Sequence, residues 1–185
     1  ANDHIAKYGA GITEGFISDL LSYASGDSGG ALPNGKHIRN LVSISPEGSN
    51  NGYWVLFDEL TSATPGKTAH IALHPPSEAY SEVYPGKEYK WTMNKITGAN
   101  VDLSIFLGTS PTYTEIKKGV VGSYGNSFAT NYLYSTYPTD NTTVKKNIVT
   151  VLFPNNAGHE KAYMVSVSGS NYTGALIYLD NDTVD

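Results

Sequence analysis

The chain has 185 residues, a formal net charge of −5 and only 16 % charged residues, whereas Gly and Tyr are abundant. This length suits one domain with a substantial core, and the composition favours strands joined by tight turns. The negative net charge and the lack of a basic cluster argue against a nucleic-acid partner. No apolar run approaches the roughly 20 residues that cross a bilayer. The lack of cysteine excludes disulfides and thiolate metal sites.

The first apolar pattern, over residues 12–23, has two interpretations. Ile12, Phe16, Leu20 and Leu21 are spaced so that this segment forms either one helix or two short strands broken at Gly15. The pattern alone does not choose between them.

A hairpin follows. Residues 39–44 read as a strand that ends at a Ser-Pro turn, and residues 53–60 form an aromatic and β-branched run. The polar segment 47–52 between them is typical of a hairpin loop, so we expect the two strands to pair antiparallel.

Further apolar segments bounded by Gly, Pro, Asn or Asp continue to the end of the chain. They are residues 69–73, 88–96, 101–107, 131–137, 146–153, 162–168 and 174–178. About eight to ten short strands without amphipathic helices between them predict an all-β protein, an antiparallel β-sandwich of two packed sheets.

Several polar side chains near the ends of these strands are candidate ligands. His37, Asp58 and His74 would converge if their strands are neighbours, and three N/O ligands with an open position suit zinc or a similar divalent ion. His70 and His74 cannot share one metal, because residues four apart on a strand lie about 13 Å apart. The alternative is that the two strand histidines are half-buried hydrogen-bonding residues, while Asp58 caps a turn or pairs with Arg39.

Motifs of nucleophilic and nucleotide chemistry are missing. The sequence has no Gly-x-Ser-x-Gly elbow, Walker loop or dinucleotide fingerprint, and Gly-Asp-Ser-Gly-Gly at 26–30 is not evidence for a serine protease. The 14 tyrosines instead supply flat amphipathic rings that can stack on sugars. Trp54 and Trp91 lie in apolar runs, which favours a place in the core.

Four segments together resemble a known family. They are Gly-Asp-Ser-Gly-Gly-Ala at 26–31, His37-x-Arg39-Asn-Leu-Val, Val-Leu-Phe-Asp-Glu-Leu at 55–60, and Leu-His-Pro at 73–75. In this order they resemble the β-sandwich domain of heparinase II/III-like polysaccharide lyases. Residues 147–154 are similar to the last shared strand of that domain, so the resemblance covers residues 15–185.

The resemblance implies that residues 1–185 are a single β-sandwich domain, excised from a larger secreted bacterial protein. In the family this domain follows an α/α-toroid, absent here, and the substrate cleft lies between the two. The family reaction is β-elimination on a uronic acid: a Tyr or His removes the C5 proton while neighbouring groups neutralise the carboxylate. Most of these groups belong to the helical part, and the β-domain contributes a histidine and, in several members, a structural metal.

By this resemblance His74 is a possible contributor to the cleft. His37, Arg39 and Tyr53 are expected substrate contacts, and His37, Asp58 and His74 are the expected ligands of a divalent metal. Where family members carry two alternating histidines, this chain has His37 and then Arg39. Arg39 therefore either holds Asp58 in a bidentate pair or meets a substrate carboxylate.

Three functions remain open at this point. The chain is the β-sandwich part of a polyuronate lyase, such as an alginate or glycosaminoglycan lyase, inactive alone and forming one wall of the cleft beside its toroid. Alternatively, it is a non-catalytic module that binds an acidic polysaccharide. In the third interpretation it is a structural domain of a large secreted protein.

Overall fold

The computed structural model describes residues 9–47, 51–93, 100–123, 126–139, 145–156, 163–170, 172–179 and 183–184. Most of these residues lie in β-strands, and η1 (Gly29–Ala31) is the one helical turn among them. No helix within these ranges is long and apolar enough to span a membrane.

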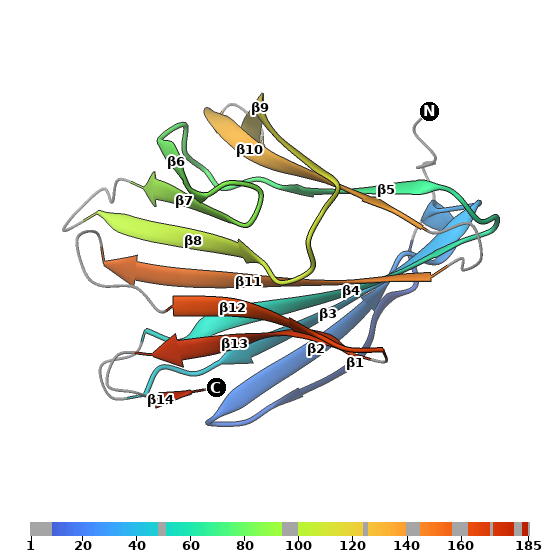
Figure 1. The fold of residues 1–185 in the computed structure, drawn as a ribbon, viewed down its shortest axis with the longest axis horizontal. Helices are drawn as coiled ribbons and strands as arrows, with labels where there is room; N and C mark the ends of the chain where they lie inside the picture. Colours follow the sequence, from blue (N-terminus) through green and yellow to red (C-terminus); the bar gives the residue numbers. More distant parts are fainter. Residues whose placement is uncertain are drawn as a thin grey trace.

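A large central sheet of eight strands organises the molecule (Figure 1), in the order β1-β2-β3-β4-β11-β8-β7-β6. Its strands are β1 (Gly11–Ile17), β2 (Leu21–Asp27), β3 (Gly35–Ile44), β4 (Tyr53–Ser62), β6 (Tyr80–Tyr84), β7 (Glu88–Met93), β8 (Val101–Leu107) and β11 (Lys145–Asn156). Every neighbouring pair in it is antiparallel.

Two smaller antiparallel sheets pack on the central one, and each has three strands. The β5-β10-β9 sheet contains β5 (Thr68–Leu73), β10 (Asn126–Pro138) and β9 (Tyr113–Ser123). The β12-β13-β14 sheet contains β12 (Tyr163–Ser168), β13 (Thr173–Leu179) and β14 (Thr183–Val184).

Alternate side chains of strand β11 pack against the two smaller sheets, which lie on opposite faces of the central sheet. Side chains alternate between the faces of a strand. Ile148 accordingly belongs to a cluster of buried residues formed with the β5-β10-β9 sheet, and Leu152 packs against another. Val151 and Phe153, in contrast, belong to the cluster formed with β12 and β13. The central sheet is thus covered on both faces along this strand, and three layers result.

The expected hairpin forms between β3 and β4, with Ile44 opposite Tyr53. Gly52 closes its loop with a φ of 71°, in the left-handed region that glycine adopts without strain. A Cβ atom at this position would lie 2.5 Å from the carbonyl oxygen of Ile44, so the turn depends on this glycine.

The predicted all-β sandwich is confirmed, with a third layer that the pattern did not indicate. The open question at residues 12–23 is answered in favour of strands, because β1 and β2 pair through Phe16 and Tyr23. Strands β6, β9 and β14 were not expected. Two predicted strands, 88–96 and 162–168, extend over residues 94–96 and 162, which lie outside the described residues.

The cover over the central sheet is uneven. In the clusters of buried residues, the β5-β10-β9 sheet meets β4, β7, β8 and β11, and the described parts of β1 and β2 contribute to none of them. Ile17 on β1 is 90 % exposed and Leu41 on β3 is 36 % exposed. We call β1, β2 and β3 the free half of the central sheet and the remaining strands its covered half.

Candidate functional site

Three of the sequence-predicted residues meet where the free half joins the covered half. Arg39 on β3 lies directly opposite Asp58 on β4, so both side chains point to the same face of the sheet. His37 precedes Arg39 by two positions and therefore shares that face. This is the face on which the β5-β10-β9 sheet packs, because Leu60, also on that side of β4, packs against the cluster of Ile71 and Tyr137.

Asp58 accepts three hydrogen bonds from these two basic side chains. Nε of Arg39 donates to Oδ1 at 2.7 Å, Nη2 donates to Oδ2 at 2.9 Å, and Nε2 of His37 lies 2.6 Å from Oδ1. The Asp58 side chain is fully buried, whereas those of His37 and Arg39 are 25 % and 37 % exposed. The bidentate pair with Arg39, one of the predicted alternatives, is confirmed.

The electrostatics of this cluster favour an ionised aspartate. Burial is the largest single influence on Asp58, and it raises the pKa of the carboxyl. The hydrogen bonds and positive charges of His37 and Arg39 act in the opposite direction, and together they hold its pKa below the usual value. Arg39 thus carries a compensated charge in a fixed orientation.

Both basic side chains retain unused nitrogen atoms. Within the described part of the chain, neither Nδ1 of His37 nor Nη1 of Arg39 has a hydrogen-bond partner. If the neutral imidazole donates from Nε2 to Asp58, its Nδ1 atom is an acceptor that can take a proton. The cluster can therefore bind an anionic group through Arg39 and exchange a proton through His37, with Asp58 fixing the orientation of both.

His74 lies elsewhere. It follows β5, and its ring stacks on Tyr132 of β10 with centroids 4.2 Å apart and an interplanar angle of 6°. Because Leu73 and Leu133 next to these two residues point into the core, both rings lie on the outer face of the β5-β10-β9 sheet. The predicted convergence of His74 with His37 and Asp58 is wrong.

This placement bears on the predicted metal site. No group of three His, Asp or Glu side chains that could hold a metal occurs among the described residues. Both carboxylate oxygens of Asp58 already accept hydrogen bonds from Arg39 or His37. The predicted ligands His37, Asp58 and His74 do not fit a divalent ion in this geometry.

Tyr53 is also not where a substrate contact requires it. Its ring is 6 % exposed and stacks on Phe153, with centroids 5.9 Å apart, in the core beneath β12 and β13. The expected substrate contact at Tyr53 is therefore corrected to a core residue. Trp91 is completely buried, as expected, whereas Trp54 is 38 % exposed.

The sequence did not reveal a row of rings on the outer face of the β5-β10-β9 sheet. Besides the pair of His74 and Tyr132, His70 stacks on Tyr134 at 4.9 Å, and Nζ of Lys117 lies 3.7 Å from the Tyr134 ring centroid. The available signal was the two-residue spacing of Tyr132 and Tyr134, which places both on one side of a strand. Sequence alone did not show which side would be exposed.

Comparisons with known proteins fit this architecture. No family model and no curated protein matches the chain. Among solved structures, it is similar to heparan sulfate lyase HepC from Pedobacter heparinus, with a TM-score of 0.72, 12 % identity, and coverage of 94 % of this chain and 27 % of that one. A structure of heparinase III gives a TM-score of 0.67, 11 % identity, and coverage of 94 % and 26 %.

These likenesses establish the fold. The chain has the β-sandwich fold of part of the heparinase III structures, which confirms the resemblance first seen in the sequence motifs. It spans about a quarter of the length of the solved chains it matches.

Proposed function

We propose that this chain is the β-sandwich domain of a secreted bacterial polysaccharide lyase acting on a polyuronate such as alginate, where it forms one wall of the substrate cleft and is inactive alone. The observation that carries the proposal is the cluster of His37, Arg39 and Asp58 at the border of the free half. The likeness in fold to heparan sulfate lyase HepC supports the same function.

The chemistry of the cluster suits a uronic acid. β-Elimination removes a proton next to a carboxylate, and it is faster when that carboxylate is neutralised. Arg39 retains Nη1 for such an anion, while its other contacts to the buried Asp58 keep the guanidinium in place. A group that is oriented before the substrate arrives loses little freedom on binding, which favours affinity.

The free half of the central sheet fits a missing companion domain. Three apolar side chains in β1 and the turn after it, apart from Phe16 on the opposite face beside Tyr23, are more than half exposed, namely Ile12, Ile17 and Leu20. An apolar hollow of about 530 Å³ lies beside them, between Gly15, Ala24 and Leu41. Exposed apolar surface of this kind marks an interaction face. We assign it to the helical toroid of the same polypeptide, which would close the cleft over Arg39 and His37.

A second candidate function is a non-catalytic module that binds an acidic polysaccharide. It is favoured by the row of half-buried Tyr132 and Tyr134 and their exposed histidine partners, with Lys117 beside them. Aromatic faces next to a cation are suited to the apolar faces of sugar rings and to their acidic substituents.

The two functions are separated by incubating the chain with alginate and heparin oligosaccharides, following both the absorbance of unsaturated uronate products and retardation in a gel. Retardation without product is expected from one wall of a cleft, and it should fall in the Arg39→Lys variant, which keeps the charge but loses the planar fork. Retardation that instead depends on Tyr132 and Tyr134 would favour the binding module. The absence of both signals would contradict both functions.

A further inference from the structure

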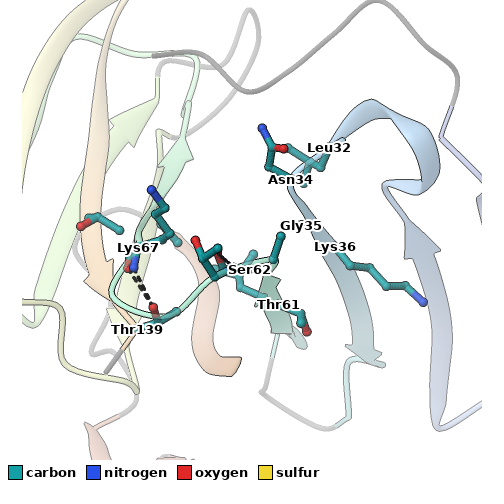
Figure 2. Close-up of a pocket in the computed structure, with 13 residues that line it drawn as sticks. Leu32, Asn34, Gly35, Lys36, Thr61, Ser62, Lys67 and Thr139 are labelled. Atoms are coloured by element: carbon teal, nitrogen blue, oxygen red, sulfur yellow. Dashed lines mark hydrogen bonds between the residues drawn. The ribbon is translucent and has the colours of Figure 1, made fainter. Parts of the chain in front are cut away.

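A further cleft lies at one end of the sandwich, on the same face of β3 as His37 and Arg39. Figure 2 shows its 13 lining residues, and its volume is about 390 Å³. They belong to the start of β3 and the loop before it, the end of β4, the loop after it, the start of β5 and the residue after β10, namely residues 32, 34–36, 60–64, 67–69 and 139. This volume is within the range of small-molecule sites, about 300–1,000 Å³.

The charge of this cleft is opposite to that of the chain. No Asp or Glu is among its lining residues, although the whole chain has a net charge of −5. Of its two lysines, Lys36 forms an ion pair with Asp27 at 2.9 Å and points away from the other labelled residues in Figure 2. Lys67 has no ion-pair partner within the described ranges. Among the described residues that line the cleft, Lys67 is therefore the one uncompensated cation.

The backbone of Lys67 is held firmly. Its N–H donates to Oγ1 of Thr139 at 3.0 Å, and its carbonyl oxygen accepts from the Thr139 N–H at 2.7 Å. Gly66 before it has a φ of 69°, which a glycine adopts without strain. On the other side of the loop, the Ala63 N–H donates to the Asn34 carbonyl oxygen at 2.8 Å. The loop that carries the cation is thus fixed before any ligand binds, which lowers the entropy cost of binding.

The rest of the lining suits a sugar ring. Hydroxyl groups of Thr61, Ser62, Thr64 and Thr68 and the amide of Asn34 offer both donors and acceptors. Leucine and alanine side chains lie among them, at Leu32, Leu60, Ala63 and Ala69. Hydroxyls, small apolar groups and the ammonium group of Lys67 match a pyranose that carries one anionic substituent.

We propose that this cleft is a subsite for an acidic sugar unit, with Lys67 binding its carboxylate or sulfate group. Gly35, which lines the cleft, and Arg39 lie on the same face of β3, four residues and therefore about 13 Å apart. One polysaccharide chain can run along this line from the Lys67 cleft to the Arg39 cluster. The subsite thus extends the proposed function and rests on it.

The test measures the affinity of the native chain and two matched variants for alginate hexasaccharide, heparin hexasaccharide and neutral cellohexaose by titration calorimetry. Lys67→Gln and Lys36→Gln remove the same charge at the same cleft, but only Lys67 is free to meet a ligand. We expect Lys67→Gln to weaken binding of an acidic oligosaccharide about tenfold, the size of one charge-assisted hydrogen bond. Lys36→Gln should bind as the native chain does, and Lys67→Arg should restore most of the loss.

Each outcome decides the proposal. A loss confined to Lys67→Gln supports the subsite. A loss seen with alginate, whose only anionic groups are carboxylates, identifies a carboxylate as the group bound, whereas a loss seen with heparin alone points to a sulfate. Equal losses in both variants would mean diffuse charge attraction and overturn it. If both variants bind normally while Arg39→Lys does not, the subsite is wrong and the proposed function stands. If the native chain binds none of the acidic oligosaccharides, or binds cellohexaose equally well, the subsite is also overturned.

Discussion

The two halves of the central sheet have the same strand geometry and opposite surroundings. In the covered half, side chains such as Trp91, Ile105 and Val151 are at most 1 % exposed. In the free half, Ile12 and Ile17 of β1 are 78 % and 90 % exposed. Alternation along a strand determines the face on which a side chain lies. Whether that face belongs to the core or stays exposed depends on whether a second sheet packs on it.

The cluster of Arg39, His37 and Asp58 combines a buried carboxylate with two partly exposed basic groups because it lies at the border between these halves. Asp58, on β4, lies under the β5-β10-β9 sheet, where water is excluded, while its two partners on β3 reach the free half. Charges interact more strongly where water is excluded. The carboxylate can thus fix two basic groups whose other nitrogens stay available to a ligand.

The largest expected effect lies within the covered half. Leu133 on β10 is completely buried between the two sheets, so Leu133→Ala removes well-packed apolar surface and leaves a cavity. We expect a loss of about 2–5 kcal/mol in the free energy of unfolding. Urea denaturation followed by tryptophan fluorescence measures it, and Ile12→Ala in the free half is the control, with an expected change within about 0.5 kcal/mol. Similar losses in both variants would remove the distinction between the halves.

A somewhat smaller effect is expected at the border. Asp58→Ala leaves the guanidinium of Arg39 without its buried partner, and we expect a loss of about 3 kcal/mol in unfolding free energy. Asp58→Asn preserves the shape and one acceptor, so its loss should be smaller. The free energies of unfolding of the two variants are measured from equilibrium urea curves. A loss below about 1 kcal/mol in Asp58→Ala would show that the pair of Arg39 and Asp58 does not stabilise the contact between the two halves.

Much of this border could be predicted from the sequence, because its partners are close along the chain. Residues 39–44 and 53–60 are joined by a short polar loop, so antiparallel pairing placed Arg39 opposite Asp58 without any long-range information. His74 could not be placed this way. Its strand, β5, pairs with β10, some 60 residues further along, and that pairing put its ring on the far side of a different sheet.

The wrong prediction for Tyr53 also arose because distant strands determine its surroundings. The 53–60 pattern identifies a strand, but only the packing of β12 and β13 shows that Tyr53 faces a third layer rather than a substrate. The Gly-Asp-Ser-Gly-Gly segment has a structural role in this fold. Its Asp27 accepts a hydrogen bond from the Gly29 N–H at 2.8 Å, and Ser28 Oγ accepts from the His37 N–H at 3.0 Å, so this segment shapes the turn into β3.

Acid should remove the stabilisation that Asp58 provides through its ion pair with Arg39, whereas the apolar core within the described residues carries no group that titrates in this way. Because the pKa of Asp58 is lower in the folded chain than its usual value near 3.8, its ionisation stabilises the fold above that value. This contribution is lost as the pH falls through the lower folded pKa. Urea midpoints measured from pH 7 to pH 2 should therefore converge for the native chain and Asp58→Asn at the acidic end. A difference that stays constant over the whole range would contradict the ionised pair.

The smallest effect on stability, and a specific effect on association, is expected at the outer strand of the free half. Ile17 on β1 is 90 % exposed, so Ile17→Lys should change the free energy of unfolding by less than about 0.5 kcal/mol. A lysine on an edge strand opposes pairing with other chains. We therefore expect sedimentation of the native chain to show concentration-dependent self-association that the variant lacks. A variant that loses as much stability as Leu133→Ala would mean that β1 is packed in solution. Unchanged association would mean that the apolar surface of β1 takes no part in contacts between molecules.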